Sequence, residues 1–148
     1  MSLDNLYREV ILDHYSHPRN HGVVDPADVM REGANPLCGD EIRVSLRVRD
    51  GIVEDVRFEG KGCSISQAST SMMTELVKGK RVEEVGGLIA AFKAMMHGEP
   101  PGDDLGDLEA LQGVRKFPVR VKCATLGWVT LEGALDELAD TRGPKRGT

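Results

Sequence analysis

Residues 41–59 constrain the fold more than any other part of the chain, because they read as an antiparallel β-hairpin. In the first half, apolar side chains alternate with polar ones, as in a strand with one face on a core and one in water. The apolar members are Ile42, Val44, Leu46 and Val48. Asp50-Gly51 is a strong signal for a two-residue hairpin turn. We therefore expect strands at 41–49 and 52–59.

Apolar residues at helical spacing predict four helices around this hairpin. They span residues 3–15, 64–78, about 82–96 and 124–140. Residues 23–35 read as irregular, and residues 117–122 read as an extended run that leads into Cys123. A small antiparallel sheet with helices packed on one face is an architecture that suits these elements. The sequence therefore predicts an α+β fold with about three strands.

The chain of 148 residues is long enough for one domain with a real core, which we place at residues 1–140. Residues 98–113 contain several Gly, Pro and Asp residues and read as a loop with a short helix near 105–111. The polar residues 141–148 are expected to form a disordered tail.

Composition argues against several classes of function. A net charge of −5 and an aromatic content of 4% disfavour nucleic-acid binding, which needs a basic surface and stacking platforms. No apolar run approaches the roughly 18 residues that span a membrane. The N-terminal residues lack a signal peptide's basic and apolar regions, and three cysteines do not suit a disulfide framework. We expect a cytoplasmic protein, monomeric in isolation, that binds neither nucleic acid nor membranes.

The chain has only three cysteines, and each lies beside Gly, Pro or a predicted helix start. Cys38 and Asp40 are two residues apart, so on an extended chain their side chains point the same way. Asp40 also shares parity with Ile42, which turns it toward whatever packs on the sheet. Cys63 and Cys123 are each expected to open a helix, where the helix dipole favours a thiolate. We expect these four side chains to converge at one end of the sheet.

Isolated cysteines in a domain of this kind are usually small buried hydrophobes, and no C-x-x-C pair is present to indicate a metal. Their local contexts favour a site instead, because reactive and ligating thiols are found at such junctions. Three thiolates and one carboxylate form a complete tetrahedral set for zinc. The same set can nucleate an iron–sulfur cluster. The candidate metal ligands are Cys38, Asp40, Cys63 and Cys123.

Four segments resemble the IscU-like iron–sulfur cluster assembly family, also called the NifU N-terminal-like domain. They are His17-Pro18-Arg19-Asn20, Pro36-Leu37-Cys38-Gly39-Asp40, Gly60-Lys61-Gly62-Cys63-Ser64-Ile65-Ser66 and Pro118-Val119-Arg120-Val121-Lys122-Cys123. By order and spacing the resemblance covers residues 3–140. It implies a fold like that of SufE and NifU.

In two features the chain differs from scaffold-type members and resembles the SufU branch of the family. Lys122 stands where those members carry a His before the third cysteine, and residues 98–113 lengthen the stretch between the second and third cysteines. The resemblance implies zinc held by the four candidate ligands and sulfur received from a SufS-like cysteine desulfurase, then passed to downstream cluster-assembly proteins. It also implies that Cys38 is the sulfur acceptor and leaves the zinc when a desulfurase residue replaces it.

Two alternatives to this sulfur-transfer interpretation remain open. One is a scaffold that assembles a labile [2Fe-2S] cluster on the same residues, and the other is a structural zinc domain whose function is to bind proteins. Arg120 is a candidate to steady a thiolate or contact Asp40, and the alternative is a solvated charge. The four histidines lie outside the cysteine-bearing segments and are expected at the surface or in local hydrogen bonds: His14, His17, His21 and His97.

Overall fold

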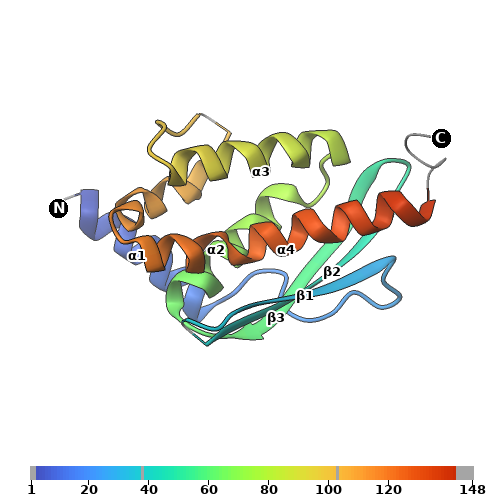
Figure 1. Cartoon of the computed structure of the whole chain (residues 1–148), viewed down its shortest axis with the longest axis horizontal. Coiled ribbons are helices and arrows are strands. Elements are labelled where there is room, and N and C mark those ends of the chain that lie inside the picture. Colours follow the sequence, from blue (N-terminus) through green and yellow to red (C-terminus); the bar gives the residue numbers. More distant parts are fainter. Residues whose placement is uncertain (1–2, 38, 103, 143–148) are drawn as a thin grey trace.

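The computed structural model describes residues 3–37, 39–102 and 104–142. Three antiparallel strands form one sheet in the order β1-β2-β3. Their bounds are β1 Val29–Asn35, β2 Asp40–Arg49 and β3 Ile52–Lys61. The helices are α1 Leu3–Ser16, α2 Ser64–Val77, α3 Val82–Met96 and α4 Pro118–Arg142, with a 3-10 helix η1 at Gly106–Lys116. Figure 1 shows the helices gathered on one side of the sheet, which confirms the predicted α+β class.

The β2–β3 hairpin forms as predicted. Asp50 and Gly51 both have positive φ, 55° and 77°, as a two-residue type I′ turn requires. The alternating apolar residues of β2 face the helices, and Val44 and Leu46 are 0% exposed. Arg43, opposite them on the pleat, is only half-buried and pairs with acidic neighbours. The sheet therefore has one dry and one wet face.

Strand β1 corrects the prediction that residues 23–35 are irregular. Its segment lacks the alternation of a typical strand, yet Val29–Asn35 pairs along β2, from Val29 opposite Leu46 to Asn35 opposite Asp40. Gly33 weakens the local strand signal but is needed here. A Cβ on Gly33 would overlap Thr130 Oγ1 of α4, so the glycine lets the helix lie close to the strand.

The N-terminus of α4 corrects the prediction of an extended run at residues 117–122. The helix begins at Pro118, where the fixed φ of proline and its missing N–H are tolerated. The alternating valines of this run suggested a strand, but they lie in the first turn of the longest helix of the described chain. Cys123 is therefore in the second turn of α4 and not at its start.

The predicted helices at α1, α2 and α3 are confirmed, with ends that differ by at most one residue. Gly79 follows α2 with φ 85°, as expected for a residue that terminates a helix. The segment predicted as a loop at 98–113 is partly wrong. Its short helix is longer than expected and of 3-10 type, from Gly106 to Lys116. The predicted tail lies mostly at residues 143–148, outside the described residues.

Helix α4 lies across β1 and β2 and also contacts α2, as Figure 1 shows. Two close approaches hold it there. Trp128 of α4 stacks on Phe92 of α3, with ring centroids 4.7 Å apart. A Cβ on Gly127 would overlap Thr70 Oγ1 of α2, so this pair of helices packs at short distance. This packing places the N-terminal half of α4 near the end of the sheet at which β2 begins with Asp40.

His14 is buried, which corrects the expectation of a surface or locally bonded histidine. The residue is 2% exposed, and its Nδ1 lies 2.8 Å from Ser71 Oγ of α2. The Nε2 atom lies 3.7 Å from carboxylate oxygens of both Glu75 and Asp107. Burial, followed by the charge of Arg19, lowers the pKa of His14, against the opposing effect of those carboxylates. The other three histidines are exposed, as expected.

Among the described residues, the helices are too short or too polar to cross a membrane.

Candidate metal centre

Asp40, Cys63 and Cys123 converge at the end of the sheet, although they are far apart in sequence. One ligand atom from each lies within 4.8 Å of the others. They come from three elements: Asp40 from the first residue of β2, Cys63 from the residue before α2, and Cys123 from α4. The fourth predicted ligand, Cys38, lies outside the described residues.

The Asp40 carboxylate is buried and oriented by the backbone of the α2 N-terminus. It is 1% exposed, and its Oδ1 accepts a hydrogen bond of 2.8 Å from the Cys63 N–H. Its Oδ2 lies 3.7 Å from Cys63 Sγ. The parity with Ile42 predicted from the sequence places it on the dry face. One oxygen is thus held by the backbone while the other faces the thiol.

Gly62 makes room for this carboxylate. Its φ is +144°, and a Cβ there would overlap Asp40 Oδ1 and lie 2.9 Å from the Asp40 Cα. Only glycine adopts this backbone readily and leaves the space empty. The Gly-Lys-Gly run before Cys63 therefore shapes the site as well as the turn into α2.

Cys63 is the N-cap residue of α2, as predicted, and its side chain makes no capping hydrogen bond. The thiol is therefore not engaged with the first turn of the helix and can face Asp40. It is half-buried. This position places the Cys63 thiol beside the free N–H groups at the positive end of the α2 dipole.

Cys123 is fully buried and faces the same point from inside α4. Cys123 was predicted to open a helix, but it lies in the second turn of α4. Its place beside the other two candidate ligands is therefore not explained by a helix N-terminus. A residue that sequence reasoning missed lies beside it: Asn35 Nδ2 is 3.9 Å from Cys123 Sγ. The sequence feature that could have identified Asn35 is its position directly before Pro36, at the start of the segment that contains Cys38.

The three described candidate ligands suit a tetrahedral metal ion. Zinc binds sulfur at about 2.3 Å and carboxylate oxygen at about 2.0 Å, so two such ligand atoms are about 3.5 Å apart. The distance of 3.7 Å between Cys63 Sγ and Asp40 Oδ2 is close to this value. Thiolates with one carboxylate suit zinc, and they also suit iron in a cluster. The site is therefore a candidate metal centre whose donor set alone does not choose the ion.

The profile of the family described as "NifU-like N terminal domain" matches residues 6–135, which is most of the chain. The chain belongs to this family. A relative from Bacillus subtilis, named zinc-dependent sulfurtransferase SufU, is 54% identical over 133 residues, covering 88% of this chain and 90% of the relative. The Streptococcus pyogenes iron-sulfur cluster assembly scaffold protein IscU is 41% identical, covering 95% of this chain and 89% of the relative. Both branches considered from the sequence are thus represented among relatives of this NifU-like domain.

A solved structure supports the fold of this NifU-like domain. It is a crystal structure from Fervidobacterium islandicum AW-1, described as an iron-sulfur cluster assembly scaffold protein for the SUF system. The TM-score is 0.83 at 36% identity, and the match covers 90% of this chain and 99% of the other.

Arg120 and Lys122 are exposed near the start of α4. Arg120 lines a surface hollow with Phe117, Pro118 and Val119. Within the described part of the NifU-like domain, no hydrogen bond or ion pair joins Arg120 to Asp40 or to either thiol. Its suggested role toward the site therefore stays a prediction.

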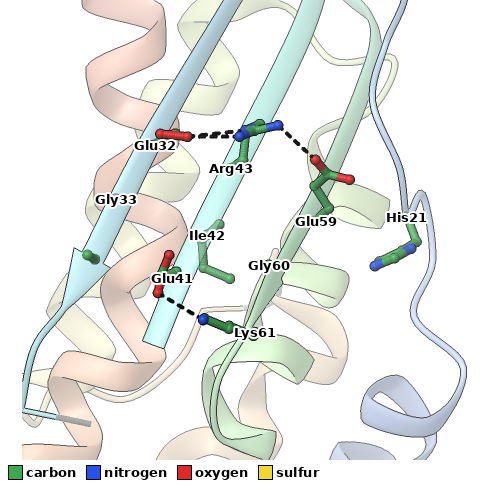
Figure 2. Close-up of a pocket in the computed structure, with 10 residues that line it drawn as sticks. His21, Glu32, Gly33, Glu41, Ile42, Arg43, Glu59, Gly60 and Lys61 are labelled. Atoms are coloured by element: carbon green, nitrogen blue, oxygen red, sulfur yellow. Dashed lines mark hydrogen bonds and ion pairs between the residues drawn. The ribbon is translucent and has the colours of Figure 1, made fainter. Parts of the chain in front are cut away.

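The wet face of the sheet carries a separate hollow of about 540 Å³, shown in Figure 2. Arg43 lies between Glu32 and Glu59 there and is 3.0 Å from each carboxylate. Lys61 pairs with Glu41 at 3.4 Å. These charges compensate one another, and neither described thiol lines the hollow. This hollow is therefore not part of the candidate metal centre.

Proposed function

We propose that this NifU-like domain is a zinc-bound sulfur acceptor of SufU type. It takes persulfide sulfur from a cysteine desulfurase and passes it on for iron–sulfur cluster assembly in the cytoplasm. The observation that carries the proposal is the convergence of Asp40, Cys63 and Cys123 within 4.8 Å. The similarity to a Bacillus subtilis relative named zinc-dependent sulfurtransferase supports it. So does Lys122, which replaces the histidine of scaffold-type members.

The proposed zinc ligands are Cys38, Asp40, Cys63 and Cys123. When bound, zinc keeps its thiol ligands deprotonated at neutral pH. Asp40 is the hard ligand of the set, and the Cys63 N–H holds one of its oxygens at 2.8 Å. We expect this oxygen ligand to make the site more labile than a site with four thiolates.

The proposed transfer is a thiol exchange with Cys38 as the acceptor. Its thiolate attacks the outer sulfur of a persulfide on the desulfurase cysteine. A new S–S bond forms at Cys38, the S–S bond of the donor breaks, and the donor cysteine leaves as a thiolate. One sulfur atom moves without net oxidation or reduction. Cys63 and Cys123 remain as retained ligands on the helices.

A second candidate function is a scaffold that assembles a labile [2Fe-2S] cluster on the same residues. The observation that favours it is the 41% identity to a Streptococcus pyogenes relative named as a cluster assembly scaffold. Thiolates also hold such clusters. Protein purified in air separates the two functions, since a colourless zinc-loaded protein supports sulfur transfer and a brown iron-loaded protein supports the scaffold.

The test combines metal analysis with a desulfurase assay in which a SufS-like enzyme releases sulfide from cysteine. The proposal expects one zinc per chain and faster turnover of the desulfurase when the domain is added. Cys38→Ser is expected to abolish the stimulation while the variant still binds the desulfurase, because the docking surface is larger than one thiol. A protein without zinc, or full stimulation by Cys38→Ser, would refute the proposal.

A further inference from the structure

Asn35 connects two parts of the metal centre through the two ends of its carboxamide. Its Nδ2 is 3.9 Å from Cys123 Sγ of α4, and its Oδ1 accepts a hydrogen bond of 3.2 Å from the Leu37 N–H. Asn35 is 7% exposed and Cys123 is 0% exposed, so water competes little with either contact. Hydrogen bonds in such a dry environment are stronger than at the surface.

The orientation of the carboxamide follows from its partners. The oxygen and nitrogen of an Asn side chain are assigned from the hydrogen bonds that they make. A backbone N–H can only donate, so the atom facing Leu37 must be the oxygen. The amide nitrogen then faces the sulfur, and a thiolate accepts a hydrogen bond from it. The reverse orientation would set two donors against each other and an oxygen against the sulfur.

We propose that Asn35 is a positioning residue that donates an N–H···S hydrogen bond to Cys123 and so keeps this cysteine a metal ligand and not a sulfur acceptor. The amide proton draws electron density from the sulfur lone pair, which makes the sulfur a weaker nucleophile. Partners of this kind orient metal ligands and tune them. The part of this inference that concerns sulfur rests on the proposed function, whereas the part that concerns the metal does not.

Two substitutions distinguish the roles of the two ends of the Asn35 carboxamide. Asn35→Ala removes both hydrogen bonds. Asn35→Asp is nearly isosteric and keeps an oxygen for the Leu37 N–H, but it places a second oxygen against the sulfur of Cys123. If Asn35 served only to hold the Leu37 N–H, Asn35→Ala would disturb the metal centre and Asn35→Asp would not.

The first measurement is the cobalt(II)–thiolate charge-transfer absorption of the cobalt-substituted protein. Loss of the N–H donor raises the energy of the sulfur lone pair, so the band should move to longer wavelength in both variants, and further in Asn35→Asp. Competition with a chelator should show zinc binding weakened about 10-fold or more in Asn35→Ala. A wild-type band in Asn35→Asp overturns the proposal. If that variant does not fold, a wild-type band in Asn35→Ala overturns it equally.

Ser69→Ala is the matched control. Ser69 is also buried and also lies beside this part of α4, where its Oγ donates a hydrogen bond of 2.6 Å to the Ala124 carbonyl. This contact supports the helix without touching the sulfur. The proposal therefore expects Ser69→Ala to lower the melting temperature while the cobalt band stays unchanged. A band shift in Ser69→Ala as large as in the Asn35 variants would show general loosening of the site and would refute the proposal.

The second measurement follows the sulfur. After incubation with a cysteine desulfurase and cysteine, peptide mass spectrometry should find a larger share of added sulfur on Cys123 in Asn35→Ala than in the wild type. An unchanged share refutes the claim that Asn35 keeps Cys123 from accepting sulfur. If the wild-type protein accepts no sulfur on any cysteine, the proposed function fails instead, and the cobalt band still decides whether Asn35 acts on Cys123.

Discussion

Substitution of Gly62 by alanine tests how the metal centre is built. The new Cβ would overlap Asp40 Oδ1, and the backbone would have to keep a φ of +144°. The strained backbone costs about 1–3 kcal/mol. Displacing the carboxylate also breaks its hydrogen bond with the Cys63 N–H, and a hydrogen bond to a charged group contributes about 1.5–3 kcal/mol. We expect Gly62→Ala to lower the free energy of unfolding by about 2.5–6 kcal/mol, the sum of both effects.

Gly22→Ala is the control for backbone strain alone. Gly22 has a φ of +126°, and nothing lies within 4 Å of the position of its missing Cβ. This variant should lose only the strain, about 1–3 kcal/mol. Urea unfolding followed by the fluorescence of Trp128, the single tryptophan, measures both variants. If Gly62→Ala is no less stable than Gly22→Ala, then Asp40 is not held in the way that the structure indicates.

Three other changes give expected outcomes from single contacts. Asp40→Ala should keep zinc on the thiolates yet alter sulfur-transfer kinetics, measured by metal analysis and a desulfurase assay; an unfolded metal-free variant or unchanged kinetics would contradict this. Burial lowers the pKa of His14 in the folded protein below the value of about 6.5 in the unfolded chain. As the pH falls, the unfolded chain therefore takes up a proton at this histidine before the folded protein does, so the stability that neutral His14 contributes is present above about pH 6.5 and lost below it. His14→Asn should therefore reduce the fall in melting temperature between about pH 7 and 5, and an equally steep fall would refute the assignment. Gly127→Ala should lower the free energy of unfolding by about 1–3 kcal/mol, because the new methyl group overpacks against Thr70. Thermal unfolding should show that Thr70→Ala restores part of this stability in the double variant. No loss of stability in Gly127→Ala would mean that α2 and α4 can move apart freely.

The parts of the fold that the sequence predicts correctly are those with local signals. The β2–β3 hairpin has its alternation and its Asp50-Gly51 turn, and α2 ends where Gly79 follows it. Strand β1 could not be found in this way, because pairing with β2 and the approach of α4 over Gly33 specify it. These contacts are between residues far apart in sequence, and they override the weak local preference of the segment.

The sequence predicts the convergence of Asp40, Cys63 and Cys123 but not the contacts that support them. Parity with the strand placed Asp40 on the dry face, and the glycine-flanked helix start identified Cys63. Cys123 was identified as a candidate ligand, but its position inside α4 depends on the helix beginning at Pro118, six residues before the predicted start at residue 124. Asn35 was missed because its partner is 88 residues away and only the packed fold brings the two together.

The most direct test of the account locates the transferred sulfur in the wild-type protein. Cleavage after Lys and Arg puts the three cysteines on three separate peptides, residues 32–43, 62–78 and 123–142. After incubation with a SufS-like desulfurase and cysteine, mass spectrometry of these peptides under non-reducing conditions should find the added sulfur mainly on residues 32–43, which contain Cys38. Added sulfur mainly on residues 123–142 would contradict the account and would place this NifU-like domain with the scaffold branch despite Lys122.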